Sequence, residues 1–373
     1  MGYREVRNKY SEIFETLRKD ICNGKFEVPG ALPSEHALMR RFAVARGTVR
    51  RAIDELRKHN LLSSRQGAMS VLSFRARERA AGTFGLIVPD AYYPFYSRIS
   101  AGIERFAKRT KEGGFSLLSA DLGSGERSFQ ASRALEFAEV CVREKVCGVF
   151  FQPILLMKES ERINRMILSL FDKADIPVVL LDSDIFPPPR RSKYDLVGVD
   201  NIAIGYELGR LVIKRGARRV IYFSNPYSAQ TSLLRGYGVS LAATEAGLSW
   251  NDENAFFADP TDVSAAKRLF AGKKRPDAIV AVNDYVADLI LKTLKQIGKR
   301  VPADVLLAGV NGDPISEESD PPITTAVQPC ERIGEAAVQL MLQRIADPGM
   351  PPREVHFTAP VTERASTRRR KRA

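Results

Sequence analysis

The sequence predicts an α/β protein with a small helical module at its N-terminus, and three observations support this. The length of 373 residues exceeds what one ordinary hydrophobic core holds, so two or three folded units are expected. Helical patterns fill the first 60 residues. From residue 84 onward, short apolar runs alternate with amphipathic helices, which is typical of doubly wound parallel sheets.

The net charge of +13 gathers at the two ends of the chain. Residues 1–81 contain 17 Lys and Arg against nine Asp and Glu, and residues 364–373 contain six bases and no acid. The body between them is close to neutral. Clustered basic charge marks a surface that binds polyanions, so the N-terminal module is expected to bind nucleic acid. A merely solvated charged surface is the alternative.

Several other classes of protein are excluded. No apolar run of about 18 residues occurs and residues 1–20 mix acids with bases, so a cytoplasmic protein is expected. The three histidines lack metal-ligand spacing, and GxxxxGK[ST], GxSxG and GxGxxG are absent, so no metal, cofactor or enzyme activity is predicted. Four irregularly spaced cysteines are predicted to be free thiols: Cys22, Cys141, Cys147 and Cys330.

Three short helices are predicted in the N-terminal module. The first carries one apolar stripe, formed by Tyr10, Ile13, Phe14, Leu17 and Ile21. Ser34 is placed to cap a second helix that ends near Phe42, and residues 43–47 form a short turn. The third helix ends near His59 and has its own stripe, formed by Val49, Ala52, Ile53 and Leu56.

The polar side of the third helix indicates what it binds. Arg46 and Arg50 are four residues apart and share a face with Thr48, opposite the buried stripe. Two guanidinium groups on one face can donate bidentate hydrogen bonds to guanine edges in the major groove, and solvated arginines are the alternative. Residues 61–65 and 69–72 indicate two strands of a β-hairpin wing.

These residues resemble the GntR winged-helix domain over about 65 residues. The matching segments are Leu32–Glu35, Arg46–Ala52, Leu61–Leu62 and Arg65–Gly67. The resemblance implies a winged helix-turn-helix in which Ser34, His36, Arg46, Thr48 and Arg50 face the major groove or its phosphates. It also implies that Gln66 and Gly67 approach the minor groove. Met69 departs from the family's second wing glycine.

Seven apolar runs in the body predict buried parallel strands: residues 84–88, 146–151, 176–181, 195–199, 219–223, 278–282 and 305–310. Amphipathic helices separate them, for example at 99–109, 205–215 and 286–297. The span is long enough for two lobes.

Polar and aromatic residues follow several of these strands, at positions where packing of the hydrophobic core does not require such side chains. They are residues 92–96, Gln152, Asp182, Asn283–Asp284 and Asn311, with Arg235 at a helix start. Ligands of parallel sheets bind beyond the carboxyl ends of the strands, and this mixture of groups suits a polyhydroxylated molecule. Strand-end Asp and Asn are also common turn residues, which is the alternative.

The body resembles the LacI/GalR repressor sensor, which has the periplasmic-binding-protein type I fold. The matching segments are Gly85–Val88, Ile176–Asp182, Val199–Asn201, Gly205–Tyr206, Arg235–Tyr237, Gly247–Leu248, Asn283–Asp284, Pro322–Thr325, Gln328–Pro329, Ile333–Gly334 and Arg364–Thr367. The resemblance implies three crossovers between lobes, near 186–195, 309–313 and 325–329. It also implies that one set of residues lines an effector cleft: Phe95, Tyr96, Gln152, Asp182, Arg235, Asn283, Asn311 and Gln328.

The expected organisation is a DNA-binding domain at 1–72, a linker at 73–82, a sensor and dimerisation domain at 83–367 and a basic tail at 368–373. The combination resembles the arabinose-repressor class of hybrid regulators. A homodimeric repressor of sugar-utilisation genes, released from double-stranded operator DNA by a sugar effector, is therefore expected. Activation or corepression by the ligand stays open, as does a phosphate-binding or merely solvated tail. The rival interpretations are a sugar-binding protein without DNA function and a DNA-binding domain fused to an enzyme-like body.

Overall fold

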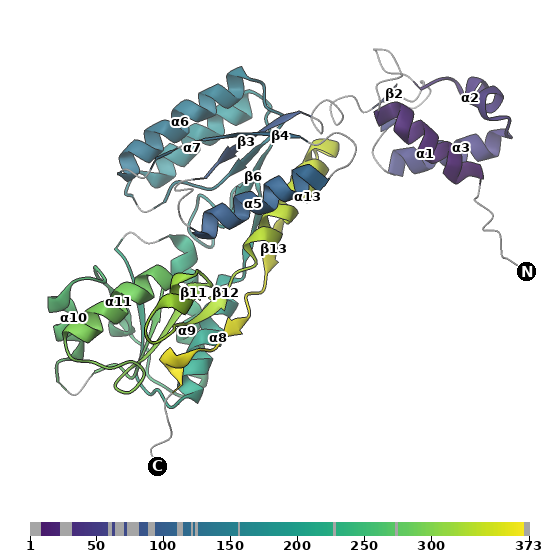
Figure 1. Ribbon diagram of the computed structural model, residues 1–373. Helices are drawn as coiled ribbons and strands as arrows, with labels where there is room; N and C mark the ends of the chain where they lie inside the picture. The colour runs from purple at the N-terminus through teal and green to yellow at the C-terminus, as the bar shows by residue number, and fades with distance from the viewer. Residues whose placement is uncertain are drawn as a thin grey trace, which may run out of the picture.

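The computed structural model separates an N-terminal module from a two-lobed body (Figure 1). The described residues are 9–22, 32–58, 62–63, 71–72, 82–88, 94–109, 115–120, 122–123, 126–155, 157–226, 229–272 and 275–368. Three predicted features lie wholly or mainly outside them, namely the wing tip with Gln66 and Gly67, the linker and the basic tail. Within the described residues, no helix combines the length and the apolar character needed to cross a membrane.

The N-terminal module contains the three predicted helices and a short antiparallel hairpin. Its elements are α1 (Lys9–Cys22), α2 (Glu35–Phe42), α3 (Arg46–Lys58), β1 (Leu62–Ser63) and β2 (Val71–Leu72). The first residue of α3 is Arg46, so this helix begins earlier than the sequence predicted.

The predicted apolar stripes form the core of this module. Each core residue is at most 4% exposed: Ile13, Leu17, Leu32, Leu38, Val49, Ala52, Ile53 and Leu56. The Ser34 hydroxyl accepts a hydrogen bond from the Ala37 N–H at 3.2 Å, which confirms the predicted cap of α2. Ala43, with a φ of 50°, ends α2 in the left-handed region and begins the turn to α3.

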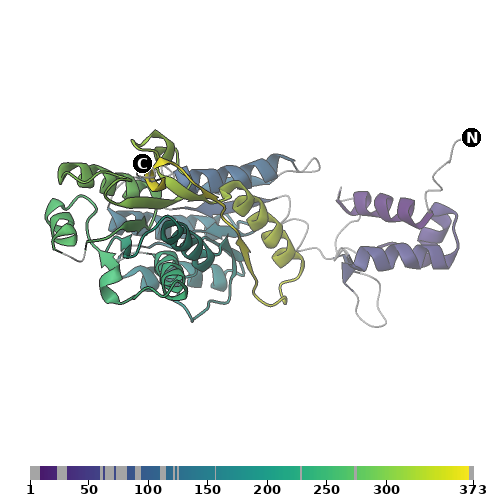
Figure 2. The same ribbon diagram turned by 90° about the horizontal axis from the view of Figure 1, so that it is seen from below.

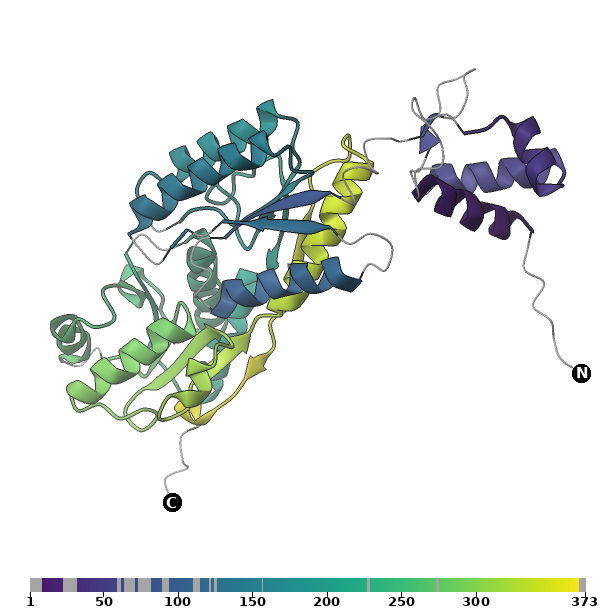
Figure 3. The same cartoon turned by 45° about the horizontal axis from the view of Figure 1, so that its top comes forward.

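The first lobe is a six-stranded parallel sheet covered on both faces. Its strand order is β13 (Glu354–Phe357), β7 (Asp195–Val199), β6 (Val178–Leu181), β5 (Val149–Phe151), β3 (Thr83–Ile87) and β4 (Ser116–Ser119). One pair of helices, α5 (Pro94–Arg109) and α13 (Cys330–Ala346), lies side by side on one face (Figure 3). The other pair, α6 (Arg127–Arg143) and α7 (Ser160–Lys173), covers the opposite face.

Successive strand residues divide between the cores on the two faces. Leu86 and Phe150 pack in the core that contains α5 and α13, whereas Ile87 and Phe151 pack in the core that contains α6 and α7. Because both faces are covered, every position along these strands has to be apolar. This explains why the runs showed no alternation of polar and apolar residues.

The second lobe has a similar sheet with one antiparallel edge. Its strand order is β14 (Val361–Thr362), β12 (Thr324–Val327), β11 (Leu306–Asn311), β10 (Ala278–Ala281), β8 (Val220–Ser224) and β9 (Ala255–Phe257). Only β14 pairs antiparallel within it. Figure 2 shows the helices layered around the sheets, including α8 (Asn201–Lys214), α9 (Gln230–Glu245), α10 (Val263–Phe270) and α11 (Asp284–Gln296).

Two of the three predicted crossovers are wrong. The strand β7 pairs with β6 in the first sheet, so the chain enters the second lobe after Val199 rather than at 186–195. Residues 309–313 stay in the second lobe, because β11 and α12 (Ile315–Glu318) both pack there. The crossover near 325–329 occurs between β12 and α13, and a further one joins β13 to β14. Crossover positions depend on which strands pair, and local pattern does not specify that.

Candidate functional sites

The exposed face of α3 brings two predicted residues together with one that was missed. The side chains of Arg46 and Arg50 are 64% and 58% exposed. The Nε of Arg46 donates to Oε2 of Glu35 at 2.6 Å, and the Nε of Arg50 donates to Oε1 of the same carboxylate at 3.1 Å. Thr48 is half-buried beside them, and His36 is exposed on α2. Glu35 therefore holds both guanidinium groups on one side of the module.

The two arginines change the acidity of the Glu35 carboxyl group. The hydrogen bond from Arg46, followed by the smaller contribution of Arg50, lowers the pKa of the Glu35 carboxyl below its usual value. In the sequence, Glu35 was marked only by its place beside Ser34 in the segment Leu32–Glu35. Its contact with the arginines becomes visible only when α2 packs against α3.

Other arginines of the module have a structural role. The guanidinium carbon of Arg51 lies 4.4 Å from the centre of the Tyr10 ring, which joins α3 to α1. Arg41 forms an ion pair with the buried carboxylate of Asp20, which joins α2 to α1. Arg46 and Arg50 are instead held by Glu35 on the exposed face of α3.

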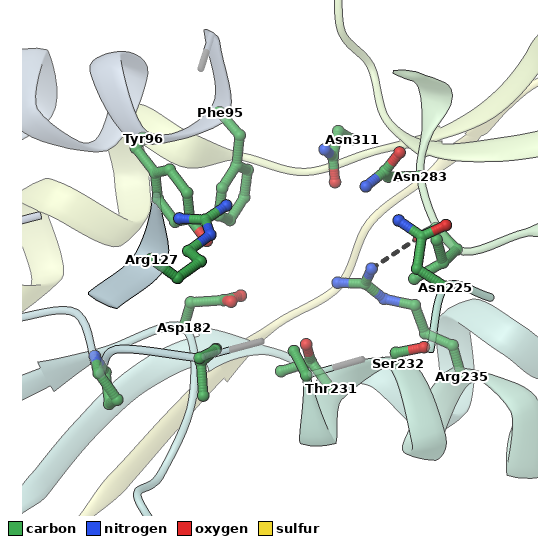
Figure 4. Close-up of a pocket in the computed structure, with 14 residues that line it drawn as sticks. Phe95, Tyr96, Arg127, Asp182, Asn225, Thr231, Ser232, Arg235, Asn283 and Asn311 are labelled. Carbon is green, nitrogen blue, oxygen red and sulfur yellow. Dashed lines mark hydrogen bonds between the residues drawn. The ribbon is translucent and has the colours of Figure 1, made fainter. Parts of the chain in front are cut away.

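A cleft between the two lobes holds most of the predicted ligand-binding residues (Figure 4). It spans about 720 Å³, including the part that is open to solvent. Six predicted residues line it: Phe95, Tyr96, Asp182, Arg235, Asn283 and Asn311. The first three come from the first lobe and the others from the second, so a ligand here would touch both.

Two predicted residues do not line the cleft. Gln152 is fully buried directly after β5, and neither atom of its amide has a hydrogen-bond partner among the described residues. Gln328 is buried after β12, and its Nε2 donates to Oδ1 of Asn311 at 2.8 Å. Gln328 therefore supports a cleft residue from behind.

Four polar residues of the cleft were not predicted: Arg127, Asn225, Thr231 and Ser232. Asn225 follows β8, so the strand-end rule that gave the other residues could have found it. Thr231 and Ser232 belong to the first turn of α9, and Arg127 is the first residue of α6.

Arg235 is the most firmly held charged residue of the cleft. It lies in the second turn of α9, not at its start as predicted, and is 6% exposed. Its Nε donates to Oδ1 of Asn201 at 2.8 Å, and its Nη1 donates to the carbonyl oxygen of Val282 at 2.8 Å. These bonds leave Nη2 to face the cleft (Figure 4).

Asp182 and Asn311 combine unusual backbone geometry with burial. Their φ angles of 65° and 119° are left-handed, a conformation that costs a non-glycine residue roughly 1 to 3 kcal/mol and that clusters at functional sites. Burial raises the pKa of the Asp182 carboxyl, and the nearby charge of Arg235 partly opposes this. The Nδ2 of Asn311 donates to Oδ2 of Asp313 at 2.9 Å, which fixes the amide.

A buried acidic network lies behind Asn311. The backbone N–H of Asp313 donates to Oδ2 of Asp284 at 2.9 Å, and burial raises the pKa of Asp284 to about 7. Arg98, from α5 of the first lobe, donates to the carbonyl oxygens of Asn311 at 3.0 Å and of Gly312 at 3.3 Å. Its Nη2 lies 3.5 Å from Oδ1 of Asp313. This network links the lobes beside the cleft.

Neither a metal site nor a disulfide is seen in the described part of the chain. No group of three or more His, Cys, Asp or Glu residues there could hold a metal ion. Cys141, Cys147 and Cys330 form no disulfide with one another. The chemistry available in the cleft is hydrogen bonding, ion pairing and ring stacking.

Two family models match separate parts of the chain. Residues 9–70 match bacterial regulatory proteins of the gntR family. Residues 210–367 match the periplasmic binding protein-like domain. The first match covers α1 to α3 and β1 and ends just before β2, and the second covers the later part of the two-lobed body.

Similar proteins are transcriptional repressors by name. The chain is 26% identical over 319 residues to the HTH-type transcriptional repressor PurR of Vibrio vulnificus (strain CMCP6), covering 84% of this chain and 87% of that protein. It is 26% identical over 303 residues to the ribose operon repressor of Escherichia coli (strain K12), covering 80% and 86%. A solved complex of the transcriptional regulator CelR with cellobiose has a TM-score of 0.63 at 22% identity, covering 86% and 90%.

Proposed function

We propose that a sugar controls operator binding by this chain, which is a transcriptional regulator that joins a gntR-family DNA-binding domain to a LacI-type periplasmic-binding-protein-like domain. The observation that carries the proposal is the cleft between the lobes, in which Asp182, Arg235 and Asn283 stand beside the rings of Phe95 and Tyr96. Carboxylate, guanidinium and amide groups bond the hydroxyls of a sugar, and aromatic rings stack against its CH faces.

DNA binding and effector binding are assigned to two separate domains. Residues 1–72 form the DNA-binding domain, 73–82 the linker, 83–367 the effector-binding and dimerisation domain, and 368–373 a basic tail. Arg46, Thr48 and Arg50 of α3 enter the major groove, with Ser34 and His36 of α2 near the phosphates. The exposure of both arginines and their common orientation by Glu35 support this assignment.

The regulator acts as a homodimer on a two-fold symmetric operator. A protein with matching symmetry reads two half-sites best, so the spacing of the two DNA-binding domains decides affinity. A ligand that touches both lobes favours one relative position of those lobes, and this changes the spacing. The favoured sign is release of the operator, as for a repressor that the ligand inactivates.

Operator binding can be tested with DNA selected from a random pool by the full chain. Arg50→Ala should weaken operator binding roughly tenfold or more, because a bidentate base contact is worth about 1 to 3 kcal/mol. The matched control is Arg51→Ala, which removes the same charge from the next residue, whose side chain stacks on Tyr10. Equal losses in the two folded variants, or no loss in Arg50→Ala, would overturn the assignment of α3.

Ligand control can be tested by fluorescence anisotropy of the operator complex against a panel of sugars, sugar phosphates and sugar acids. At least one compound should shift operator affinity in wild type and leave it unchanged in Arg235→Ala.

Light scattering at micromolar concentration should give a dimer without DNA. A monomer with and without operator would remove the spacing mechanism, and a compound that strengthens operator binding would reverse its sign.

A further inference from the structure

We propose that the effector of the cleft is acidic, a sugar derivative bearing a phosphate or carboxylate group, and that Arg127 selects it. This inference rests on the proposed function of the cleft as the effector site. It narrows the class of ligand from sugars in general to polyhydroxylated anions.

The charges that line the cleft are unbalanced. Its charged lining residues are Arg127, Arg235 and Asp182, two cations against one carboxylate. Asp182 is 7% exposed, and its Oδ1 has no hydrogen-bond partner among the described residues. Whether this carboxyl is ionised or protonated, the lining stays positive. A positive, partly water-excluded site favours an anion.

Among the described residues, neither guanidinium forms an ion pair with a carboxylate. Arg235 donates to Oδ1 of Asn201 and to the carbonyl oxygen of Val282, and Arg127 donates through Nη1 to Oε1 of Gln130 at 2.7 Å. All three acceptors are neutral oxygens, and no ion pair joins either arginine to a carboxylate within the described ranges. Guanidinium groups held in this way are oriented donors whose strongest partners are oxyanions.

Arg127 is placed and held for such a contact. It opens α6, a helix of 17 residues whose N-cap residue, Glu126, makes no capping hydrogen bond through its side chain. The carboxylate of Glu126, 3.5 Å from the Ser128 hydroxyl, offsets the partial positive charge of this helix N-terminus, so the guanidinium of Arg127 itself is the positive group that lines the cleft. Gln130, which is 1% exposed, holds Arg127 and donates its own Nε2 to the carbonyl oxygen of Gly123 at 3.0 Å.

The two arginines approach the cleft from different lobes. In Figure 4, Arg127 lies beside Phe95 and Tyr96 while Arg235 enters from the opposite side. Closing the lobes without a ligand brings two like charges nearer together, which costs free energy. An anion between them replaces this repulsion with attraction. A neutral sugar supplies hydroxyls for Asp182 but nothing that offsets the repulsion.

The test compares neutral and acidic compounds that share a carbon skeleton. Thermal shift and calorimetric titration of the full chain would use pentoses and hexoses, each as the sugar, its terminal phosphate and its aldonate, with inorganic phosphate alone as a reference. At least one acidic compound should bind roughly tenfold or more tightly than its neutral parent. The phosphate and aldonate arms distinguish the two sources of the anion.

The variants are Arg127→Gln and, as the matched control, Arg133→Gln, which removes an exposed charge from the same helix. Arg127→Gln should lose most of the preference for the acidic compound while keeping the melting temperature of the ligand-free protein, and Arg133→Gln should change neither. Neutral sugars that bind as tightly as their acids through Arg235 would refute this inference and leave the proposed function intact. Failure of every compound would count against both.

Discussion

Arg50 of α3 and Arg235 of the cleft are both proposed to bind ligands, yet the first is exposed and the second is buried. Arg50 is 58% exposed and is held by one surface carboxylate, that of Glu35. Arg235 is 6% exposed and is held by a buried amide and a strand-end carbonyl. An exposed arginine can be replaced at little cost to folding, whereas a buried one is part of the structure that positions it.

The comparison predicts its largest effect at the buried residue. Arg235→Ala should abolish ligand binding and lower the free energy of unfolding by about 2 to 4 kcal/mol, because two buried acceptors lose their donor. Arg50→Ala should change that free energy by less than about 0.5 kcal/mol. Urea unfolding followed by the fluorescence of Trp250, the single tryptophan, reports on the second lobe and therefore on Arg235→Ala. Far-UV circular dichroism, to which helices α1 to α3 contribute, follows the N-terminal module that carries Arg50.

The control for this experiment is Arg210→Ala, since Arg210 lies on α8 of the same lobe and, among the described residues, its ion pair is with exposed Glu207. Its effect on the unfolding free energy should be as small as that of Arg50→Ala. If Arg235→Ala also lowers the free energy of unfolding by so little, the two arginines differ in burial but not in their contribution to stability.

The sequence predicted the buried parts of the fold better than the exposed parts. All seven apolar runs correspond to strands, because burial on both faces forces continuous apolar sequence. Five strands were missed: β4, β9, β12, β13 and β14. Four of them lie at sheet edges, whereas β12 is buried beside β11 but begins with two threonines, so it does not form a continuous apolar run. Crossovers were misplaced because strand pairing between distant segments decides them.

The site residues also differ in how well the sequence predicted them. Asp182, Asn283 and Asn311 could be predicted because each lies at or just after the end of a recognisable strand. Arg127 could not, since its helix follows the missed strand β4 and nothing local marks its orientation. Glu35 was missed for a similar reason, because its role depends on the contact between two helices.

A second prediction concerns buried charge near the cleft. Burial raises the pKa of Asp284 from 3.8 to about 7, so the folded protein keeps a proton that the unfolded chain releases. This contribution to stability is complete below pH 3.8 and is lost as the pH rises to 7. Relative to Asp284→Asn, wild type should lose about 2 kcal/mol of unfolding free energy between pH 5 and pH 7.

Urea unfolding of both proteins at pH 5, 6, 7 and 8 provides the measurement. The control is Asp304→Asn, because a hydrogen bond from Arg300 lowers the pKa of exposed Asp304 and its contribution is constant over that range. Parallel stability profiles for wild type and Asp284→Asn would show that Asp284 is ionised in the folded protein.

The third prediction concerns Glu35, the residue that holds the exposed arginines of α3. Glu35→Gln removes the carboxylate that holds Arg46 and Arg50, so both guanidinium groups lose their fixed orientation. Affinity for random DNA should rise, because one negative charge leaves the interface, and the ratio of operator to random affinity should fall roughly tenfold. Anisotropy titrations with both DNAs at two salt concentrations measure this. A ratio that does not change would mean that DNA alone orients the arginines.

The smallest effect is expected at Ser34, which has two possible roles that one pair of variants separates. Its hydroxyl caps α2 through the Ala37 N–H, so Ser34→Ala should lower the stability of the N-terminal module by about 1 kcal/mol. Ser34→Gly should cost only a few tenths of a kcal/mol, because glycine is itself a tolerated N-cap. If capping is the whole role, operator affinity follows stability and Ser34→Gly binds like wild type. If the hydroxyl also binds a phosphate, Ser34→Gly loses operator affinity although it stays folded, and the salt dependence of binding stays that of wild type, because a neutral hydroxyl neutralises no phosphate charge.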